Sequence, residues 1–396
     1  MRRLMTLAAA VATLGACTER LTTPADCPAL CPGGQAVIRD TIIEAEFGLD
    51  SSVTGFASVL DGRSLLSSSG GVYGQVRAVA RFISRGDSVF LSDSSRAITA
   101  VDSAVVSLIL ERRDSTVGGL VVELYRLPSS IDTLVTLAEV DAAMVPANLL
   151  ATAAFDDTVR ATTMPFIFRG ADLAKLAFTP GDSTRLAIGV KVRGAGPIAV
   201  RIGGTAGTSG PAFITYARVA IADTARQRQA ITRLTDITAS VTTPAGPPLA
   251  TELPVGGLPA RRAFLRFALP SVIRDSATIL RATLELVPAR PIVGIPGDSA
   301  RIEARALLAD FGPKSPVVSN RGAITYIKAG ADTVRLDVVG LTQLWQGTEA
   351  LPSAVRLNLT EEYGTFLAPV FNSTRAATGR PRLRITYRLP FGFEGF

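Results

Sequence analysis

Histidine is absent from this 396-residue chain, which also has only three cysteines and one tryptophan. A serine or cysteine nucleophile normally needs a histidine base, so triad hydrolysis is excluded. The usual zinc sites are excluded as well, because they need four Cys or His ligands. The longest apolar run, residues 4–14, is well short of the roughly 20 residues that span a bilayer. We therefore expect a protein that is not an enzyme and has no transmembrane helix.

The N-terminal run is nevertheless informative. Arg2 and Arg3 precede it, and it closes on Leu14-Gly15-Ala16-Cys17, which resembles the bacterial lipobox. This pattern predicts a signal peptide over 1–16 and acylation of Cys17, which would tether the chain to a membrane. An ordinary secretory signal is the alternative. Thr18, in place of the Asp that retains many lipoproteins at the inner membrane, favours the outer membrane or cell surface.

The two remaining cysteines lie in a Pro-rich linker predicted over residues 17–35. Cys27 and Cys31 are four residues apart, in a compartment that permits disulfides. We expect them to form a small disulfide, since a metal site would need two further ligands.

Positive charge is spread thinly along the chain. The formal net charge is +7, carried almost entirely by arginine. Arginines alternate with apolar residues, as in Arg261-Arg262-Ala263-Phe264-Leu265-Arg266-Phe267, instead of clustering in one basic stripe. The pattern predicts solvated strand faces and no nucleic-acid partner.

Short alternating runs of β-branched and leucine residues fill the rest of the chain. Gly-Asp-Ser turns at 86–88, 181–183 and 297–299 separate some of them, which predicts an all-β protein. Helical patterns are scarce, and the two best candidates are Thr224–Thr232 and Val339–Trp345.

An internal duplication organises these runs. Five segments recur in the same order, and they are matched as follows: Arg81-Phe82 with Arg266-Phe267, 101–108 with 279–286, 122–127 with 302–307, 185–188 with 356–359, and Ile-Thr-Tyr at 214–216 with 385–387. The closing strands differ by one residue in their distance from Pro211 and Pro381, which predicts a bulge or a register change. We expect two tandem β-sandwiches, over 36–218 and 235–390, with a linker over 219–234 and a tail over 391–396.

The second copy resembles the DNRLRE domain, a β-jelly roll related to family-96 carbohydrate-binding modules of secreted and cell-surface bacterial proteins. The segments that carry the resemblance are Phe264–Pro270, Ile279–Leu286, Leu336–Trp345 with its Gln-x-Trp, and Arg380–Tyr387. Ala268 stands where the family has Asp, and the first copy lacks the tryptophan. The resemblance implies a jelly-roll fold and leaves the ligand open, because members differ in what they bind.

Few residues suggest a site. Tyr326 and Tyr363 are the candidate ligand contacts, whereas Tyr216, Tyr387 and Trp345 are expected to be structural, the last packing from a short helical turn onto the core. No cofactor is expected, although calcium stays open, with Asp236 and Asp337 as candidate ligands.

The paired acids are expected to be solvated loop residues. They lie at 156–157 and 361–362, beside turn formers. A glycosidase would instead need two carboxylates held close together in a cleft. The sequence thus predicts a lipid-anchored envelope protein that binds polysaccharide or another envelope protein, or a structural spacer without ligand; a polysaccharide-acting enzyme is a weaker alternative.

Overall fold

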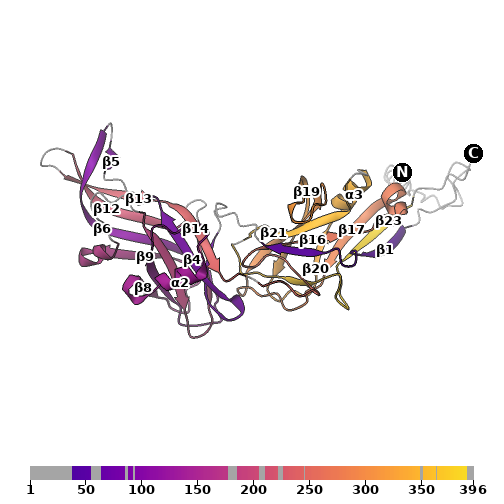
Figure 1. Ribbon diagram of the computed structural model, residues 1–396, viewed down its shortest axis with the longest axis horizontal. Helices are drawn as coiled ribbons and strands as arrows, with labels where there is room; N and C mark the ends of the chain where they lie inside the picture. Colours follow the sequence, from indigo (N-terminus) through magenta and orange to yellow (C-terminus); the bar gives the residue numbers. More distant parts are fainter. Residues whose placement is uncertain are drawn as a thin grey trace, which may run out of the picture.

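The computed structural model describes residues 38–54, 64–84, 88–91, 94–176, 185–204, 210–221, 226–244, 246–347, 351–362 and 364–389. The predicted signal peptide, Cys17, Cys27, Cys31, Tyr363 and the C-terminal tail lie outside these residues. The described chain is predominantly β-strand, so the all-β prediction is confirmed. Its strands fall into two lobes arranged end to end (Figure 1).

Lobe 1 consists of the described residues of 64–244 and holds one twelve-stranded antiparallel sheet that folds back on itself. Its strands are β3 (Leu65–Ser69), β4 (Gln75–Phe82), β5 (Ser88–Leu91), β6 (Ser94–Arg113), β7 (Val121–Leu127), β8 (Leu149–Ala154), β9 (Thr162–Arg169), β10 (Ala187–Arg193), β11 (Ala199–Ile202), β12 (Ala212–Ala220), β13 (Arg226–Arg233) and β14 (Thr235–Thr242). The 3-10 segment η4 (Gly170–Leu176) follows β9. Alternate residues of these strands, such as Val106, Leu108 and Leu110, fill the core between the two halves of the sheet.

Lobe 2 consists of 38–54 and the described residues of 246–389. A four-stranded sheet, in the order β1-β23-β17-β20, packs against a five-stranded sheet, in the order β19-β18-β21-β16-β2, and β15 pairs with β22 beside them. The strands are β1 (Ile38–Glu44), β2 (Ser51–Thr54), β15 (Glu252–Pro254), β16 (Arg261–Arg266), β17 (Thr278–Leu286), β18 (Ser299–Leu307), β19 (Val317–Lys328), β20 (Val334–Asp337), β21 (Ala354–Leu359), β22 (Val370–Asn372) and β23 (Arg382–Arg388).

In the part of the chain that the structure describes, two α-helices accompany the sheets. In lobe 1, α2 (Leu137–Ala143) begins at a capping box, in which Thr136 and Glu139 satisfy each other's backbone N–H groups. In lobe 2, α3 (Val339–Gly347) confirms the predicted helix at this position. The ring of Trp345, which is 1% exposed, lies 6.5 Å from that of Phe267 in the core, as expected. The other predicted helix, Thr224–Thr232, is wrong: residues 226–233 form β13, which pairs with β12 along eight residues.

The pairing of strands repeats between the lobes. In lobe 1, β10 lies between β4 and β7, and β6 lies between β12 and β9; in lobe 2, β21 lies between β16 and β18, and β17 lies between β23 and β20. Cross-strand partners then fix which residues correspond. Val122 faces Val192 as Ile302 faces Leu359, and Ala104 faces Thr215 as Ala282 faces Ile385. The duplication predicted from the sequence is therefore present in the strand topology as well as in the residue pattern.

Two of the five sequence matches need a shift of register. The pairing aligns 189–192, and not 185–188, with 356–359. It also aligns Thr215 with Ile385, so that the two Ile-Thr-Tyr segments are offset by one residue, as the distances from the prolines suggested. Tyr387 consequently faces the core, whereas Tyr216 faces outward and packs under Arg228 at 4.7 Å.

The first two strands of each copy are exchanged. β1 and β2 precede the first copy in sequence, yet they pair with β23 and β16 of lobe 2. β13 and β14 precede the second copy, yet they occupy the corresponding places in lobe 1, against β12 and β4. The strand pairing therefore differs from the predicted domain boundaries: residues 38–54 join lobe 2, residues 235–242 join lobe 1, and the predicted linker contributes to a β12–β13 hairpin.

The lobes meet at a junction that is partly apolar and partly charged. Leu66, Val76 and Ala199 of lobe 1 pack with Ile295 and Phe366 of lobe 2. Beside them the carboxylate of Asp298, whose side chain is 4% exposed, accepts a hydrogen bond from Arg201 Nη1 at 3.0 Å and lies 3.5 Å from Arg112 Nε. Because the carboxylate belongs to lobe 2 and the guanidinium groups belong to lobe 1, these ion pairs join the two lobes.

An acid-sensitive ion pair lies on the outer face of the four-stranded sheet. Burial raises the pKa of Glu285, but hydrogen bonds and charges from Arg382 and Arg335 outweigh it and hold that pKa below its usual range. A lowered folded-state pKa stabilises the fold above the unfolded value of about 4.3, and this contribution is lost as pH falls through the folded value. We expect Glu285→Gln to reduce the loss of stability below pH 4, measured by urea unfolding at pH 3 to 7; equal acid sensitivity in both proteins would contradict this assignment.

Candidate functional site

The outer face of the five-stranded sheet in lobe 2 gathers polar side chains from three neighbouring strands. On β18, residues 301, 303 and 305 point outward, because 300, 302, 304 and 306 fill the core. Cross-strand pairing places Asn358 beside Glu303 and Arg356 beside Arg305. We call this set, with Arg262 of β16 and Tyr326 of β19, the arginine face.

Tyr326 is the one predicted contact residue that the structure describes. It pairs with Arg301 across β18 and β19, and its side chain is 69% exposed. The neighbouring Ile324, on the same face, is 52% exposed. The phenol thus stands beside a guanidinium at the margin of the arginine face, a combination that suits stacking and hydrogen bonding with a sugar. Tyr363 lies outside the described residues.

Carboxylates hold three of the arginines in place, and Arg305 Nε lies 2.7 Å from Glu303 Oε1. Glu362 accepts two hydrogen bonds from Arg262, each of 2.8 Å, in a fork geometry. Glu361 Oε1 lies 2.9 Å from Arg301 Nε, and its other oxygen accepts the backbone N–H of Arg301. Although burial raises the pKa of Glu361, these hydrogen bonds lower it below its usual range. Because the general acid of a glycosidase needs a raised pKa, Glu361 is unsuited to that role.

Arg356 lies at the centre of the arginine face without a carboxylate of its own. Among the described residues, nothing accepts a hydrogen bond from its buried Nε, and the buried Oδ1 of the neighbouring Asn358 has no donor. Asn358 is 7% exposed, and its amide nitrogen donates to the backbone oxygen of Leu359. Burial, then the charges of Arg262 and Arg305, lower the pKa of Arg356. The charges of Glu362 and Glu303 partly offset this effect, so the guanidinium of Arg356 lies among groups of both signs.

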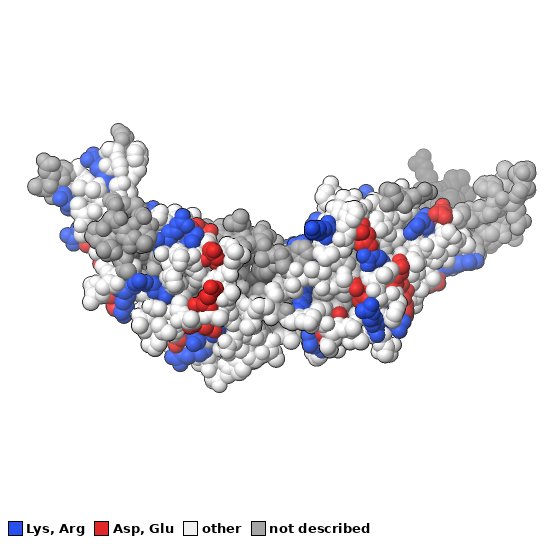
Figure 2. All heavy atoms as spheres, viewed as in Figure 1, with Lys and Arg blue, Asp and Glu red and all other residues white. Residues whose placement is uncertain are grey.

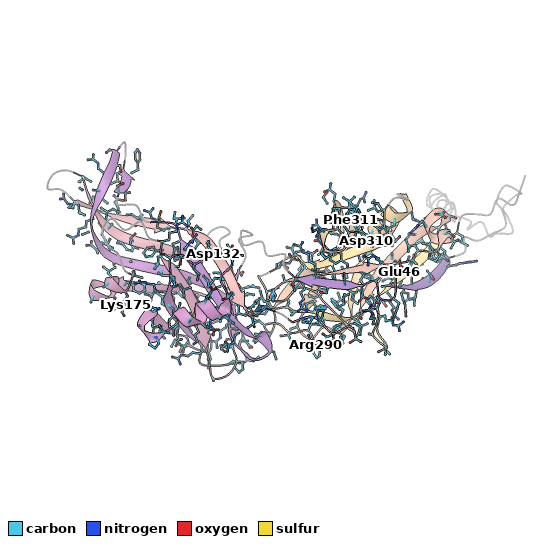
Figure 3. All side chains as sticks on the ribbon, viewed as in Figure 1. Glu46, Asp132, Lys175, Arg290, Asp310 and Phe311 are labelled. Atoms are coloured by element: carbon cyan, nitrogen blue, oxygen red, sulfur yellow. The ribbon has the colours of Figure 1, made fainter. Side chains whose placement is uncertain are left out.

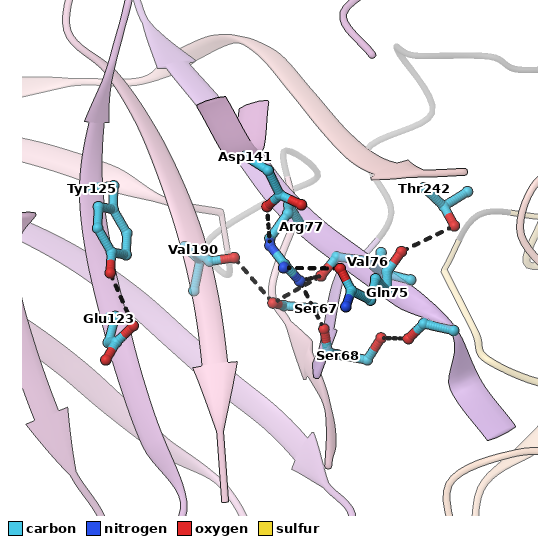
Figure 4. A network of polar contacts seen from close by, with 11 residues as sticks. Ser67, Ser68, Gln75, Val76, Arg77, Glu123, Tyr125, Asp141, Val190 and Thr242 are labelled. Carbon is cyan, nitrogen blue, oxygen red and sulfur yellow. Dashed lines mark hydrogen bonds and ion pairs between the residues drawn. The ribbon is translucent and has the colours of Figure 1, made fainter. Parts of the chain in front are cut away.

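The corresponding face of lobe 1 is covered. Arg77 and Glu123 stand where lobe 2 has Arg262 and Glu303, but α2 packs over this sheet, with Leu137 and Val140 against Val79 and Leu127. Arg77 donates to Asp141 of α2 at 2.8 Å and to the backbone oxygen of Ser68 at 3.0 Å (Figure 4). The place of Arg356 is taken by Gly189, where a Cβ would lie 2.3 Å from Met144 Cε. The two copies thus differ, since no helix among the described residues packs over the lobe 2 face in this way.

The segment between β18 and β19 is short in lobe 2, where the arginine face ranges from the buried Asn358 to the exposed Tyr326. It carries Asp310 and Phe311, which lie beside the sheet (Figure 3). Asp310 Oδ1 accepts a hydrogen bond from Arg266 Nη2 at 2.6 Å, and Phe311 is 70% exposed. The outer faces of both lobes carry interspersed positive and negative side chains, so no single basic stripe forms on the visible side (Figure 2).

A shallow pocket beside α2 in lobe 1 is a weaker candidate. It is lined by Pro128, Ser130, Ile131, Asp132, Leu134, Val135 and Glu139. Its two acids already have structural roles, because Glu139 caps α2 and Asp132 accepts the backbone N–H of Leu134 at 2.8 Å. The pocket therefore offers no spare carboxylate to a ligand.

The two calcium candidates are not brought together. Asp236 pairs with Arg81 and Arg185 in lobe 1, each at about 3 Å, whereas Asp337 is exposed in lobe 2 and accepts the backbone N–H of Val339. Within the described parts of the chain, no three His, Cys, Asp or Glu residues are grouped so as to hold a metal ion. Asp157, the second acid of the predicted loop pair at 156–157, accepts the backbone N–H of Gly119 at 2.8 Å.

The sequence predicted an exposed Tyr326 but did not single out Arg356 and Asn358 at the centre of the arginine face. The signal was present in Arg356-Leu357-Asn358-Leu359, whose alternation predicts one polar face. That Arg356 has no carboxylate partner depends on residues from β16 and β18, which lie at least 50 positions away in sequence. A single strand cannot reveal which polar residues its neighbours satisfy.

Comparisons with known proteins add little. No protein-family model and no curated protein matches the chain. Among solved structures, a chain in the cryo-EM atomic structure of Broad Bean Stain Virus aligns with 87% of this chain and 92% of its own, at 9% identity and a TM-score of 0.17. A similarity at that TM-score carries no argument. None of the described helices has the length and apolar character needed to cross a membrane.

Proposed function

We propose that this protein is a lipid-anchored, non-catalytic component of the bacterial cell envelope that binds polysaccharide through the arginine face of lobe 2. The single observation that carries the proposal is Arg356: none of the described carboxylates forms an ion pair with this half-buried guanidinium, which lies between two other arginines and beside the unsatisfied Oδ1 of Asn358. A carboxylate of an acidic sugar, such as a uronate, would satisfy the guanidinium, and a hydroxyl would donate to Asn358 Oδ1. Tyr326 would provide a stacking surface at the margin.

The location follows from the N-terminal sequence alone. Cys17, in its lipobox-like setting, would be acylated after cleavage, and the membrane would hold the chain through that anchor. The outer membrane or cell surface is the destination that Thr18 favours. We also propose a relationship to DNRLRE-type carbohydrate-binding modules. This proposal likewise rests on sequence, namely on the strand motifs of the second copy.

A glycan array tests the binding. The chain from Gln35 onward, which keeps every described residue, is applied with and without calcium to neutral glycans and to glycans that carry uronates. We expect preferential binding to the uronates. Binding to neutral glycans alone would contradict the role of Arg356, and binding only with calcium would indicate a metal-dependent site instead.

Substitution of Arg356 separates function from stability. We expect Arg356→Gln to weaken uronate binding by about tenfold or more, because a charged hydrogen bond contributes about 1.5–3 kcal/mol. The free energy of unfolding should stay the same or rise, since the substitution removes a cation from beside two others. Arg384→Gln, on the outer face of the other sheet of lobe 2, is the matched control and should leave binding unchanged. A loss of stability without a loss of binding would assign Arg356 a structural role.

A structural spacer without ligand is the second candidate. The end-to-end arrangement of the lobes favours it, because such a shape would hold lobe 1 away from the anchored end (Figure 1). An absence of binding to any glycan, with or without calcium, would favour the spacer.

A further inference from the structure

The duplication allows a comparison of two equivalent sheet faces. The outer face of β13, β12, β6 and β9 in lobe 1 corresponds, strand for strand, to that of β1, β23, β17 and β20 in lobe 2. Ile167 stands at the place of Asp337, because Ile167 pairs with Val105 as Asp337 pairs with Thr283. Differences between the two faces therefore come from side chains and not from architecture.

Carboxylates distinguish the two faces. In lobe 2, Asp40, Glu285 and Asp337 lie among the arginines of the face. The corresponding positions in lobe 1 hold, in the same order, Ala230, Ser107 and Ile167. An anionic surface would therefore meet repelling acids on the lobe 2 face but not at the centre of the lobe 1 face.

Arginines gather at one end of the lobe 1 face. They are Arg169 on β9, Arg218 on β12, and Arg226 and Arg228 on β13. All four are exposed. The acids near this end are already paired, Asp102 with Arg218 and Asp172 with the lysine three residues further on, each at 2.9 Å. This end of the face therefore has a net positive charge.

Tyr216 marks the border between these arginines and an apolar area. The guanidinium carbon of Arg228 lies 4.7 Å from the centre of the tyrosine ring. Among the described residues, no ion pair forms with Arg228 or Arg169. On the other side of Tyr216 lie Ile214, Val105 and the exposed Ile167 and Pro165. Cations, a tyrosine and aliphatic side chains in this order suit the boundary between lipid headgroups and acyl chains.

We propose that the outer face of lobe 1 binds a lipid surface that carries anionic headgroups. The arginines would contact the phosphate groups, and Ile167 and Pro165 would reach the boundary with the acyl chains. A polysaccharide is recognised through aromatic rings and polar groups, so the aliphatic centre of this face favours lipid over a glycan.

The place of the anchor is compatible with this contact, which here rests on the proposed acylation of Cys17. Residues 18–37 join Cys17 to β1, and a chain of this length reaches at most about 70 Å. Ile38 lies at the end of lobe 2 far from lobe 1 (Figure 1). A chain attached in this way can lie along the membrane, and the attachment keeps the lobe 1 face at a high local concentration.

Vesicle co-sedimentation tests the proposal with the chain from Gln35 onward, so that the result does not depend on acylation. The vesicles contain phosphatidylcholine alone or phosphatidylcholine with phosphatidylglycerol. We expect binding to the anionic vesicles that weakens as salt is raised, and little binding to the neutral ones. An absence of binding to the anionic vesicles would overturn the proposal. The glycan array tests the arginine face separately, and Arg356→Gln should leave vesicle binding unchanged.

Charge variants locate the contact. Arg169→Gln/Arg228→Gln should weaken binding to the anionic vesicles about 25-fold, at about fivefold for each arginine. Arg281→Gln/Arg384→Gln removes the same charge from exposed positions on the corresponding face of lobe 2 and should weaken it much less. Far-UV circular dichroism checks that both variants are folded. Equal weakening would mean that the net charge of the chain attracts the vesicles, and would overturn the proposal.

A fluorescent label tests whether lipid itself touches the face. The chain from Gln35 onward contains no cysteine, so Ile167→Cys creates a single site for an environment-sensitive fluorophore. Its emission should shift to the blue on addition of anionic vesicles, whereas a label at Ile324→Cys, an equally exposed position in lobe 2, should not shift. A shift at both positions or at neither would contradict the proposal. Displacement from the vesicles by a soluble polyuronate would also contradict it and would assign the face to a glycan.

Discussion

A chain that begins at Ser64 is expected to lose most of the stability of lobe 2 while lobe 1 stays folded. The deletion removes β1 and β2, which pair with β23 along seven residues and with β16 along four. Ile43 and Val53 would no longer pack on the lobe 2 core, and two strand edges would lose their partners. At about 1.5–3 kcal/mol for each buried aliphatic side chain, together with the lost pairing, the expected cost is on the order of 5 kcal/mol.

The single tryptophan makes this loss measurable. Trp345 lies in the core of lobe 2, so its fluorescence during urea unfolding reports on lobe 2, whereas far-UV circular dichroism reports on both lobes. We expect the fluorescence midpoint to fall well below that of the full chain and the circular dichroism signal to split into two transitions. A synthetic peptide of residues 38–54, added in trans, should raise the fluorescence midpoint again.

Point variants of β1 provide a finer control. Ile43 packs against the lobe 2 core, whereas its neighbour Ile42 is 54% exposed on the other side of the strand. Ile43→Ala should therefore lower the tryptophan midpoint, and Ile42→Ala should change it little. If the truncated chain unfolds with the same fluorescence midpoint as the full chain, β1 and β2 do not complete lobe 2.

Asp298→Ala is expected to weaken the junction between the lobes. The substitution leaves Arg201, whose side chain is 22% exposed, without one of its carboxylate partners, although Glu111 remains 3.2 Å from Arg201 Nε. Breaking a buried ion pair from one side costs about 3–5 kcal/mol, and the remaining glutamate places the expected value at the lower end. The tryptophan and circular dichroism transitions should separate, because the lobes no longer stabilise each other.

An exposed ion pair provides the comparison for this variant. Asp102 pairs with Arg218 at 2.9 Å, but their side chains are 29% and 59% exposed. Asp102→Ala should change the free energy of unfolding by less than about 1 kcal/mol. Small-angle X-ray scattering should show a larger radius of gyration for Asp298→Ala than for the unsubstituted chain. Asp102→Ala should leave the radius of gyration unchanged. Equal effects of the two substitutions would mean that Asp298 does not hold the lobes together.

The sequence predicted what depends on local pattern. Alternation along strands, turn residues and the spacing from Leu341 to Trp345 were sufficient for the all-β class, for one of two helices and for the buried tryptophan. The helix predicted at Thr224–Thr232 failed because its arginines and glutamines have good helix propensity, while pairing with β12 favours a strand. Partners from distant segments override such local preferences.

The exchange of strands between copies was beyond sequence reasoning. The residue pattern of 38–54 is compatible with either lobe, because each lobe has the same two strand edges to which these residues could pair. Their position in the chain favoured the first copy. In the structure β13 pairs with β12 of lobe 1, and β1 takes the equivalent place on the other side of β23 from β17. The same limit applies to Arg356, because the residues around its guanidinium come from three strands that are distant in sequence.

The route of the chain through lobe 2 has a mechanical consequence. From Ile38, at the end of lobe 2 far from lobe 1, the polypeptide runs along the sandwich through β1 and β2 before it enters lobe 1 (Figure 1). Tension between the N-terminal end and lobe 1 would act along these two strands, loading their hydrogen bonds in shear, where many must break at once. The rest of lobe 2 lies outside that line of force, and it would stay folded until the two strands slide free.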